Sequence, residues 1–278
     1  MITLIICSRN SDISNELKRN IAITIGVEYE LVVIDNSKND YSIFSAYNEG
    51  AKRAQYPYLC FMHEDIIYHT QDWGLFIEKH FQDETIGLIG MAGTHFLPSI
   101  PTYWSPTPFI TEYNLHNDHG KRIECYHLNF FSDKTIVDAV ACDGFCMFIR
   151  KDIFNVISFD EKTYTGFHYY DMDICMQVLT NKYRVCICRD VLIEHFWSEN
   201  PEKSGMDYFV FNQDLFFSKW QSYFPISRGI DEIPQYVLDR VNKLYESAYD
   251  ATKARNSKAY KIGKLILSPF KFLSNIKM

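Results

Sequence analysis

The chain has 278 residues, 47% of them hydrophobic, which suffices for one large domain or one domain with a small appendage. Its net charge of −7 excludes a general nucleic-acid binder, which would need excess basic side chains to neutralise phosphates. No run approaches the roughly 20 apolar residues of a membrane span, and no basic region precedes the short apolar start, so no secretion signal is expected. The eight cysteines lack zinc-knuckle spacing and fit reduced core thiols of a cytoplasmic protein.

The first third of the chain alternates apolar runs with amphipathic stretches. The apolar runs, typical of buried parallel strands, are residues 2–7, 31–34, 58–62 and 86–91. Between the first two runs, Ile13, Leu17 and Ile21 lie at helical spacing. This β-α-β-α-β order predicts an α/β fold with a mostly parallel central sheet flanked by helices and joined by right-handed crossovers.

This alternation of strand and helix patterns stops between residues 94 and 135, where prolines interleave with aromatic residues such as Tyr103 and Trp104. A long irregular segment inside a compact domain is often a binding loop, although plain packing of the aromatic rings would give the same composition. Strand character returns within residues 137–149, 184–188 and 191–193, and a helix begins near Asp171. After residue 198 the pattern is helical.

Polar side chains follow three of the predicted strands where each ends. The clusters are Ser8-Arg9-Asn10, Asp35-Asn36-Ser37 and His63-Glu64-Asp65. Open α/β sheets bind ligands at the carboxyl edge, where these strand ends meet. Carboxylates placed there can hold a divalent cation against phosphate oxygens. For any one cluster alone, a strand end followed by a solvated turn explains the pattern equally well.

The order of these clusters resembles the nucleotide half of family-2-type glycosyltransferases with the GT-A fold. In that family a polar loop after the first strand lies against the nucleotide, an acidic turn after the second holds the base, and an Asp-x-Asp triplet after the third binds metal. The three clusters occupy these positions here, and Asn48 and Gly50 match an Asn-x-Gly on the intervening helix.

The later half extends the resemblance, which covers roughly the first 200 residues. Residues 143–150 are similar to the family's Gly-x-x-Met-x-Ile-Arg strand, and residues 170–175 to its Glu-Asp-x-Asp-Leu-Cys catalytic segment. Glu194-His195 resembles a distal histidine that completes the metal site. Two residues depart from the pattern: His63 replaces the first acid of the metal triplet, and Tyr170 replaces the glutamate before the catalytic aspartate.

The resemblance implies a GT-A-like, Rossmann-like domain that transfers a sugar from a nucleoside-diphosphate donor to a hydroxyl of a glycan or lipid-linked glycan, with inversion. It implies a divalent cation, Mn²⁺ or Mg²⁺, bound by Asp65, His195 and His63; imidazole with carboxylate suits manganese better than calcium. The remaining donor or acceptor contacts that it implies are Ser8, Arg9, Asp35, Asn36, Asn48, Glu64, Asp143 and His168. Several have plain alternatives, since Asp35 also suits a turn and Arg9 a solvated surface.

The acceptor hydroxyl needs a base, and Asp171 and Asp173 compete for that role. Two side chains that are two positions apart on a helix point about 200° away from each other, so these two cannot both face one site. Asp171 shares a face with the apolar Ile174, Cys175 and Val178, which predicts that it points inward and Asp173 outward. If Asp171 opens the helix, the helix dipole favours its ionised form, and a capping role would favour Asp there too.

We expect a catalytic domain at residues 1–200, a helical extension at 201–250 and a basic amphipathic tail at 251–278. The tail has no acid, and its lysines alternate with apolar residues, which suits the surface of an anionic membrane. We therefore expect a cytoplasmic protein at the inner face of the membrane. Packing of its apolar side on the domain is the alternative. Oligomeric state cannot be predicted from the sequence.

Two other functions compete with glycosyl transfer. One is a module that binds nucleotide sugars without transferring them, which His63 and Tyr170 favour. The other is a sugar-phosphate nucleotidyltransferase, which also uses a metal and acids at a sheet edge. Such enzymes usually carry a glycine-rich basic loop after the first strand, and residues 8–11 contain no glycine.

Overall fold

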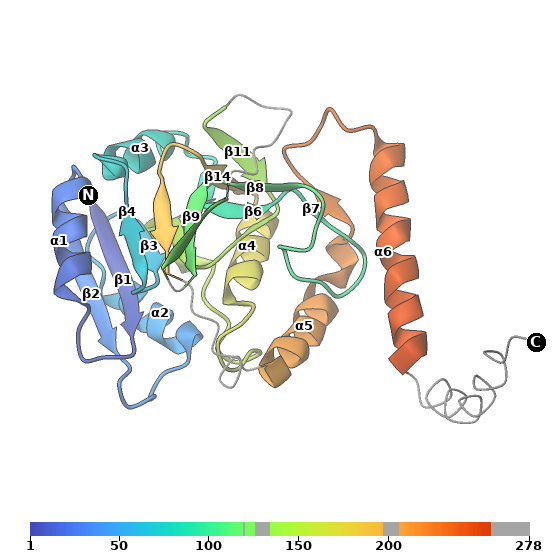
Figure 1. Cartoon of the computed structure of the whole chain (residues 1–278), viewed down its shortest axis with the longest axis horizontal. Coiled ribbons are helices and arrows are strands. Elements are labelled where there is room, and N and C mark those ends of the chain that lie inside the picture. The colour runs from blue at the N-terminus through green and yellow to red at the C-terminus, as the bar shows by residue number, and fades with distance from the viewer. Residues whose placement is uncertain (119, 126–133, 197–205, 257–278) are drawn as a thin grey trace, which may run out of the picture.

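The computed structural model describes residues 1–118, 120–125, 134–196 and 206–256. Its centre is a seven-stranded sheet in the order β11-β14-β5-β13-β3-β1-β2 (Figure 1). The strands are β1 (Ile2–Ser8), β2 (Tyr29–Asp35), β3 (Tyr58–Met62), β5 (Ile86–Gly90), β11 (Ile136–Ala139), β13 (Cys146–Arg150) and β14 (Arg184–Cys188). The helices are α1 (Asn15–Thr24), α2 (Ile43–Arg53), α3 (Trp73–His80), α4 (Tyr170–Thr180), α5 (Met206–Trp220) and α6 (Gln235–Asn256).

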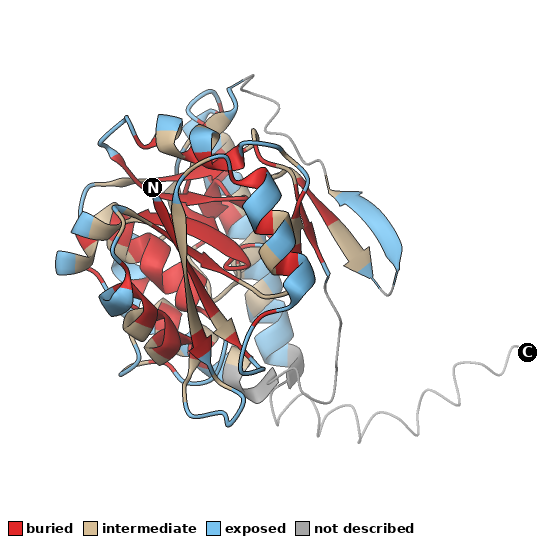
Figure 2. Cartoon of the chain, turned by 90° about the vertical axis from the view of Figure 1, so that its left-hand side faces the viewer, coloured by how far each residue is buried: buried red, intermediate tan, exposed pale blue. Residues whose placement is uncertain are grey.

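The central sheet is mostly parallel, as predicted. Strand β1 pairs in parallel with β2 and β3, and β14 pairs in parallel with β5. Strand β13 is antiparallel to both β3 and β5, and β11 is antiparallel to β14. Five of the seven strands therefore share one direction. Figure 2 shows these strands as the buried core of the molecule, and Ile2, Leu4, Ile5 and Ile6 of β1 have no exposed surface.

Three small sheets extend the fold, and they correct the expectation that residues 94–135 are irregular. The first has the order β10-β9-β15-β4 and the second β12-β6-β8, while β16 pairs with β7. Their bounds are β4 (Ile66–Tyr68), β6 (Ala92–Thr94), β7 (Phe96–Leu97), β8 (Ile110–Glu112), β9 (Asn114–Asp118), β10 (Lys121–Cys125), β12 (Ala141–Cys142), β15 (Ile193–His195) and β16 (Ile226–Ser227). Strands this short carry little periodicity, and most pair with partners far away in the sequence.

Helices α5 and α6 follow the sheet and confirm the helical C-terminal extension (Figure 1). Phe216 of α5 belongs to the main core, whereas Leu238 of α6 packs in a second cluster with Phe96 and Ile230. None of the helices in the described ranges is long and apolar enough to cross a bilayer. Most of the predicted basic tail, residues 257–278, lies outside the described residues.

Helix α2 sits close to the sheet at Asn48 and Gly50, the two residues of the Asn-x-Gly motif. The Asn48 side chain donates to the carbonyl of Phe159 at 2.8 Å and accepts from its amide at 3.0 Å. A Cβ on Gly50 would stand 2.2 Å from Cγ2 of Ile5, so only glycine allows this approach of α2 to β1. Both residues thus fix the packing of α2.

We predict that Gly50→Ala destabilises the fold. Overpacking against Ile5 costs about 1–3 kcal/mol, which outweighs the gain of about 1 kcal/mol in helix propensity. Urea denaturation should show this loss, whereas Lys52→Ala on the exposed side of α2 should change stability little. In an Ile5→Ala background the cost of Gly50→Ala should shrink, because the clashing atom is gone. An unchanged cost would contradict the packing argument.

Candidate functional site

The three predicted polar clusters lie at the carboxyl ends of β1, β2 and β3. The Ser8 hydroxyl donates to Oε2 of Glu64 at 2.5 Å, and Nε of Arg9 donates to Oε1 at 3.2 Å. Ser8 is the register partner of Asp35 across β1 and β2, and the Asn36 amide donates to the Ser8 carbonyl. The first cluster is therefore in contact with both others.

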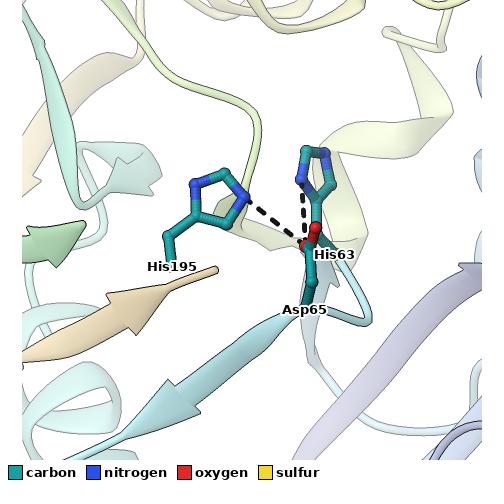
Figure 3. A group of neighbouring side chains, drawn as sticks. All are labelled: His63, Asp65 and His195. Carbon is teal, nitrogen blue, oxygen red and sulfur yellow. Dashed lines mark ion pairs between the residues drawn. The ribbon is translucent and has the colours of Figure 1, made fainter. Parts of the chain in front are cut away.

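A potential metal centre is formed by His63 from the end of β3, Asp65 just before β4 and His195 from the end of β15 (Figure 3). One ligand atom of each lies within 4.8 Å of the others. Oδ1 of Asp65 is 3.4 Å from Nε2 of His195 and 3.8 Å from Nδ1 of His63. Figure 3 shows both imidazoles facing this carboxylate.

The donor set fits a divalent cation. Within the described part of the chain, the buried Oδ1 of Asp65 accepts no hydrogen bond, and its contact with Nε2 of His195 at 3.4 Å is an ion pair. Burial and the neighbouring His195 lower the pKa of His63 to about 4, so its imidazole is neutral at pH 7, as a ligand must be. The His195 ring stacks on Phe145 at 5.0 Å and an interplanar angle of 15°, which fixes its orientation.

The two departures from the family pattern contact each other. Nε2 of His63 lies 2.8 Å from the hydroxyl of Tyr170. When Nε2 carries the proton and donates to Tyr170, the lone pair of Nδ1 faces Asp65. Hydrogen-bond partners of this kind commonly orient metal-binding histidines. A His–Tyr pair therefore stands at the two positions where the resemblance described above led us to expect acids.

Asp171 occupies the first turn of α4 and is 2% exposed. The Tyr103 hydroxyl donates to its Oδ2 at 2.6 Å, and the Met172 amide donates to Oδ1 at 2.8 Å. Burial and the charge of Asp143 raise the pKa of Asp171 to about 7. The helix dipole alone would favour the ionised form of Asp171, but burial has the larger effect. The capping role is wrong, since Tyr169 is the N-cap residue.

Asp173 does not point outward, contrary to the sequence prediction. It is 1% exposed, and its carboxylate accepts from the Tyr164 hydroxyl at 2.9 Å and from Nε1 of Trp220 at 2.8 Å. Nζ of Lys219 completes a buried ion pair at 2.8 Å. The prediction failed because α5 covers the side of α4 that periodicity assigned to solvent. Asp173 connects these two helices.

The other residues predicted to contact donor or acceptor differ in exposure and in hydrogen bonding. Asp35 is exposed and its Oδ1 accepts from the Ser37 amide, while both ends of the Asn36 side-chain amide bind the backbone of Tyr41. Asp143 accepts from the Phe145 amide at 3.0 Å. The half-buried His168 ring contacts Phe167 and Phe209. Asn36 thus has a structural role in its loop, as Asn48 has on α2.

Sequence reasoning missed three participants. Tyr103 binds Asp171, Phe145 supports His195, and His116 of β9 lies 6.1 Å from the His195 ring. Only Tyr103 gave a signal, because it lies in the aromatic segment proposed as a binding loop. On the opposite face of β15, buried Glu194 accepts from Asn117, Arg122 and His69 at 2.7–3.1 Å.

The sequence matches the model of a family described as "Glycosyltransferase like family" over residues 3–220. The chain belongs to this family. Among solved structures, S. aureus TarS 1–349 is 13% identical with a TM-score of 0.50, covering 87% of this chain and 69% of that one. GalNAc-T7 with UDP, GalNAc and Mn²⁺ is 10% identical with a TM-score of 0.48, covering 70% and 44%. No curated protein matched the sequence.

The family match identifies the protein as a glycosyltransferase, as the sequence motifs predicted. The likeness to TarS supports the same mixed α/β architecture. The predicted GT-A-like fold and enzyme class are therefore confirmed. The roles of individual site residues stay predictions.

The raised pKa of Asp171 predicts a pH-dependent stability difference. A carboxyl whose pKa rises from 3.8 to about 7 on folding stabilises the protein below about pH 4, and this contribution is lost as the pH rises through about 7. At 1.36 kcal/mol per pH unit the loss approaches about 4 kcal/mol. The stability of wild type minus that of Asp171→Asn should fall by this order over that range. Urea denaturation across pH measures it.

The exposed Asp152 provides the control, because Asp152→Asn should give a flat difference over the same pH range. A flat difference for Asp171→Asn as well would mean that the folded protein does not raise its pKa.

Proposed function

We propose that this enzyme transfers a sugar from a nucleoside-diphosphate donor to a hydroxyl of a glycan or lipid-linked glycan, with inversion and with Asp171 as the base. The observation that carries the proposal is the buried carboxylate of Asp171, which follows Tyr170 in the first turn of α4, while Tyr170 contacts the metal-capable group through His63. Tyr170 precedes Asp171 and hydrogen-bonds His63, and the charge of Asp143 acts on both His63 and Asp171. The proposed base and the proposed cation site therefore both respond to the charge of Asp143.

The donor half of the proposal rests on the carboxyl edge of the sheet. A cation held by His63, Asp65 and His195 would neutralise the negative charge that develops on the leaving diphosphate. Glu64 holds the Arg9 side chain at this edge, where the guanidinium is 79% exposed and free to approach a phosphate. Exposed Asp35 is proposed to accept from the base or the ribose.

The transfer step needs one proton acceptor. The oxygen of the acceptor hydroxyl forms a bond to the anomeric carbon and gives its proton to Asp171. The bond from that carbon to the diphosphate oxygen breaks, and its electron pair leaves with the nucleoside diphosphate. We propose that the acceptor hydroxyl takes the place of the Tyr103 hydroxyl on Asp171, since Tyr103 now covers this carboxylate.

Asp171→Asn should bind the donor normally and lose transfer by about 100-fold or more, the scale of a positioned base. Wild-type activity should rise with pH through about 7 as Asp171 ionises. Tyr103→Phe should move this rise in activity to higher pH, because the hydrogen bond from Tyr103 lowers the pKa of Asp171. The assay follows release of nucleoside diphosphate from a panel of sugar nucleotides with Mn²⁺ and acceptors.

Asp173→Asn is the matched comparison on the same helix. This substitution should lower the free energy of unfolding, because breaking the buried ion pair with Lys219 costs about 3–5 kcal/mol. If correctly folded Asp173→Asn lost transfer while Asp171→Asn stayed near wild type, the assignment of the base would be reversed. Release of pyrophosphate from a nucleoside triphosphate plus a sugar phosphate would instead indicate nucleotidyl transfer.

Asp65→Ala should abolish the Mn²⁺-dependent part of nucleoside-diphosphate binding, measured by calorimetry with and without the metal. Tyr170→Phe should weaken Mn²⁺ binding by about 10- to 100-fold through the orientation of His63. Asp12→Ala, which removes an exposed carboxylate paired with Lys18, should have no effect. If Mn²⁺ left the wild-type affinity unchanged, the site would work without a cation.

A further inference from the structure

A second group of metal-capable side chains lies outside the proposed donor site. It combines His80 at the end of α3, Cys188 at the end of β14 and Asp190 in the turn before β15. One ligand atom of each lies within 4.8 Å of the other two, and Nε2 of His80 is 2.7 Å from Oδ2 of Asp190. Cys188 is fully buried, while the side chains of His80 and Asp190 are 10% and 18% exposed.

An ion pair explains only two members of this group. A His80–Asp190 contact at the C-terminal end of a helix is favourable by itself, because the helix dipole stabilises an imidazolium there. It gives no reason for a sulfur beside the pair. The buried Cys188 sulfur nevertheless lies within 4.8 Å of the ligand atoms of both His80 and Asp190.

We propose that His80, Cys188 and Asp190 form a zinc site, with one sulfur, one nitrogen and one oxygen ligand. A thiolate ligand favours zinc over Mn²⁺ and Mg²⁺, and the group of His63, Asp65 and His195 contains no sulfur, so the two sites differ in metal preference. Binding releases the thiol proton of Cys188 to solvent and takes His80 in its neutral form. The partial exposure of His80 and Asp190 provides the entry path, and water completes the four-coordinate shell.

Bound zinc would tie α3 to the turn between β14 and β15. Strand β15 carries His195, so the ion would anchor the start of the strand that supplies a ligand to the proposed donor site. The zinc proposal does not depend on that donor site, because its residues and its metal preference are separate.

Cobalt titration of the chelator-treated full chain tests the proposal. Co²⁺ reports thiolate ligation through a sulfur-to-metal charge-transfer band in the near ultraviolet, and Zn²⁺ should displace it. Cys188→Ala should lose the band. Asp190→Asn should weaken Zn²⁺ binding by more than the roughly 100-fold that changes to outer-shell partners cost. Asp65→Ala should keep both the cobalt charge-transfer band and its displacement by Zn²⁺, which separates this site from the donor site.

Cys186→Ala is the matched control, because Cys186 lies on the same strand but its thiol donates to Asp138 at 3.4 Å. It should keep the cobalt band. In an Asp65→Ala background, which removes the carboxylate of the donor site, zinc should raise the melting temperature of the parent and of Cys186→Ala but not of Asp190→Asn, a turn variant that leaves the buried core intact. A wild type without the band, a band that survives in Cys188→Ala, or unchanged zinc affinity in Asp190→Asn would each overturn the proposal.

Discussion

The buried carboxylate of Asp173 must be neutralised, and the arrangement of the N-terminal end of α4 depends on how this is done. Lys219 and Trp220 at the end of α5 supply the cation and a donor, and Tyr164 supplies a second donor. An unpaired charge at this depth would cost several kcal/mol. Because α5 must stay in place to prevent this, α4 is held between the sheet and α5. The first turn of α4 then presents Tyr170 and Asp171 in fixed positions.

Charge balance at the site follows from the His63–Tyr170 contact. Two acids at these positions would add two negative charges to an edge that already carries Glu64, Asp65, Asp143 and Asp171. The neutral pair removes that repulsion and leaves a single carboxylate, Asp65, among the three metal-capable side chains. A cation bound here would keep more of its positive charge for the diphosphate. The substitutions at 63 and 170 are thus linked by one hydrogen bond and belong together in the chemistry of the site.

The sequence predicted the sheet and the strand-end clusters because each strand carries its own apolar run and its own polar end. Contacts between distant segments were not predictable from local patterns: His63 and Tyr170 are 107 positions apart in the sequence, and no local pattern signals their hydrogen bond. Asp173 was misplaced because helical periodicity identifies one buried face, whereas α4 is covered on two. The small strands between residues 92 and 125 were missed because β15 and β12, far along the chain, complete their sheets.

Strand β15 has two faces with different chemistry, since successive residues of a strand point to opposite sides. His195 faces the metal-capable group, and Glu194 is buried on the other face among Asn117, Arg122 and His69. A slip of one residue would exchange imidazole and carboxylate between the faces and leave a charge buried without its partners. The hydrogen bonds and ion pairs of Glu194 therefore fix the register in which β15 pairs with its neighbours. They protect the identity of a ligand on the far side of the sheet from errors in strand pairing during folding.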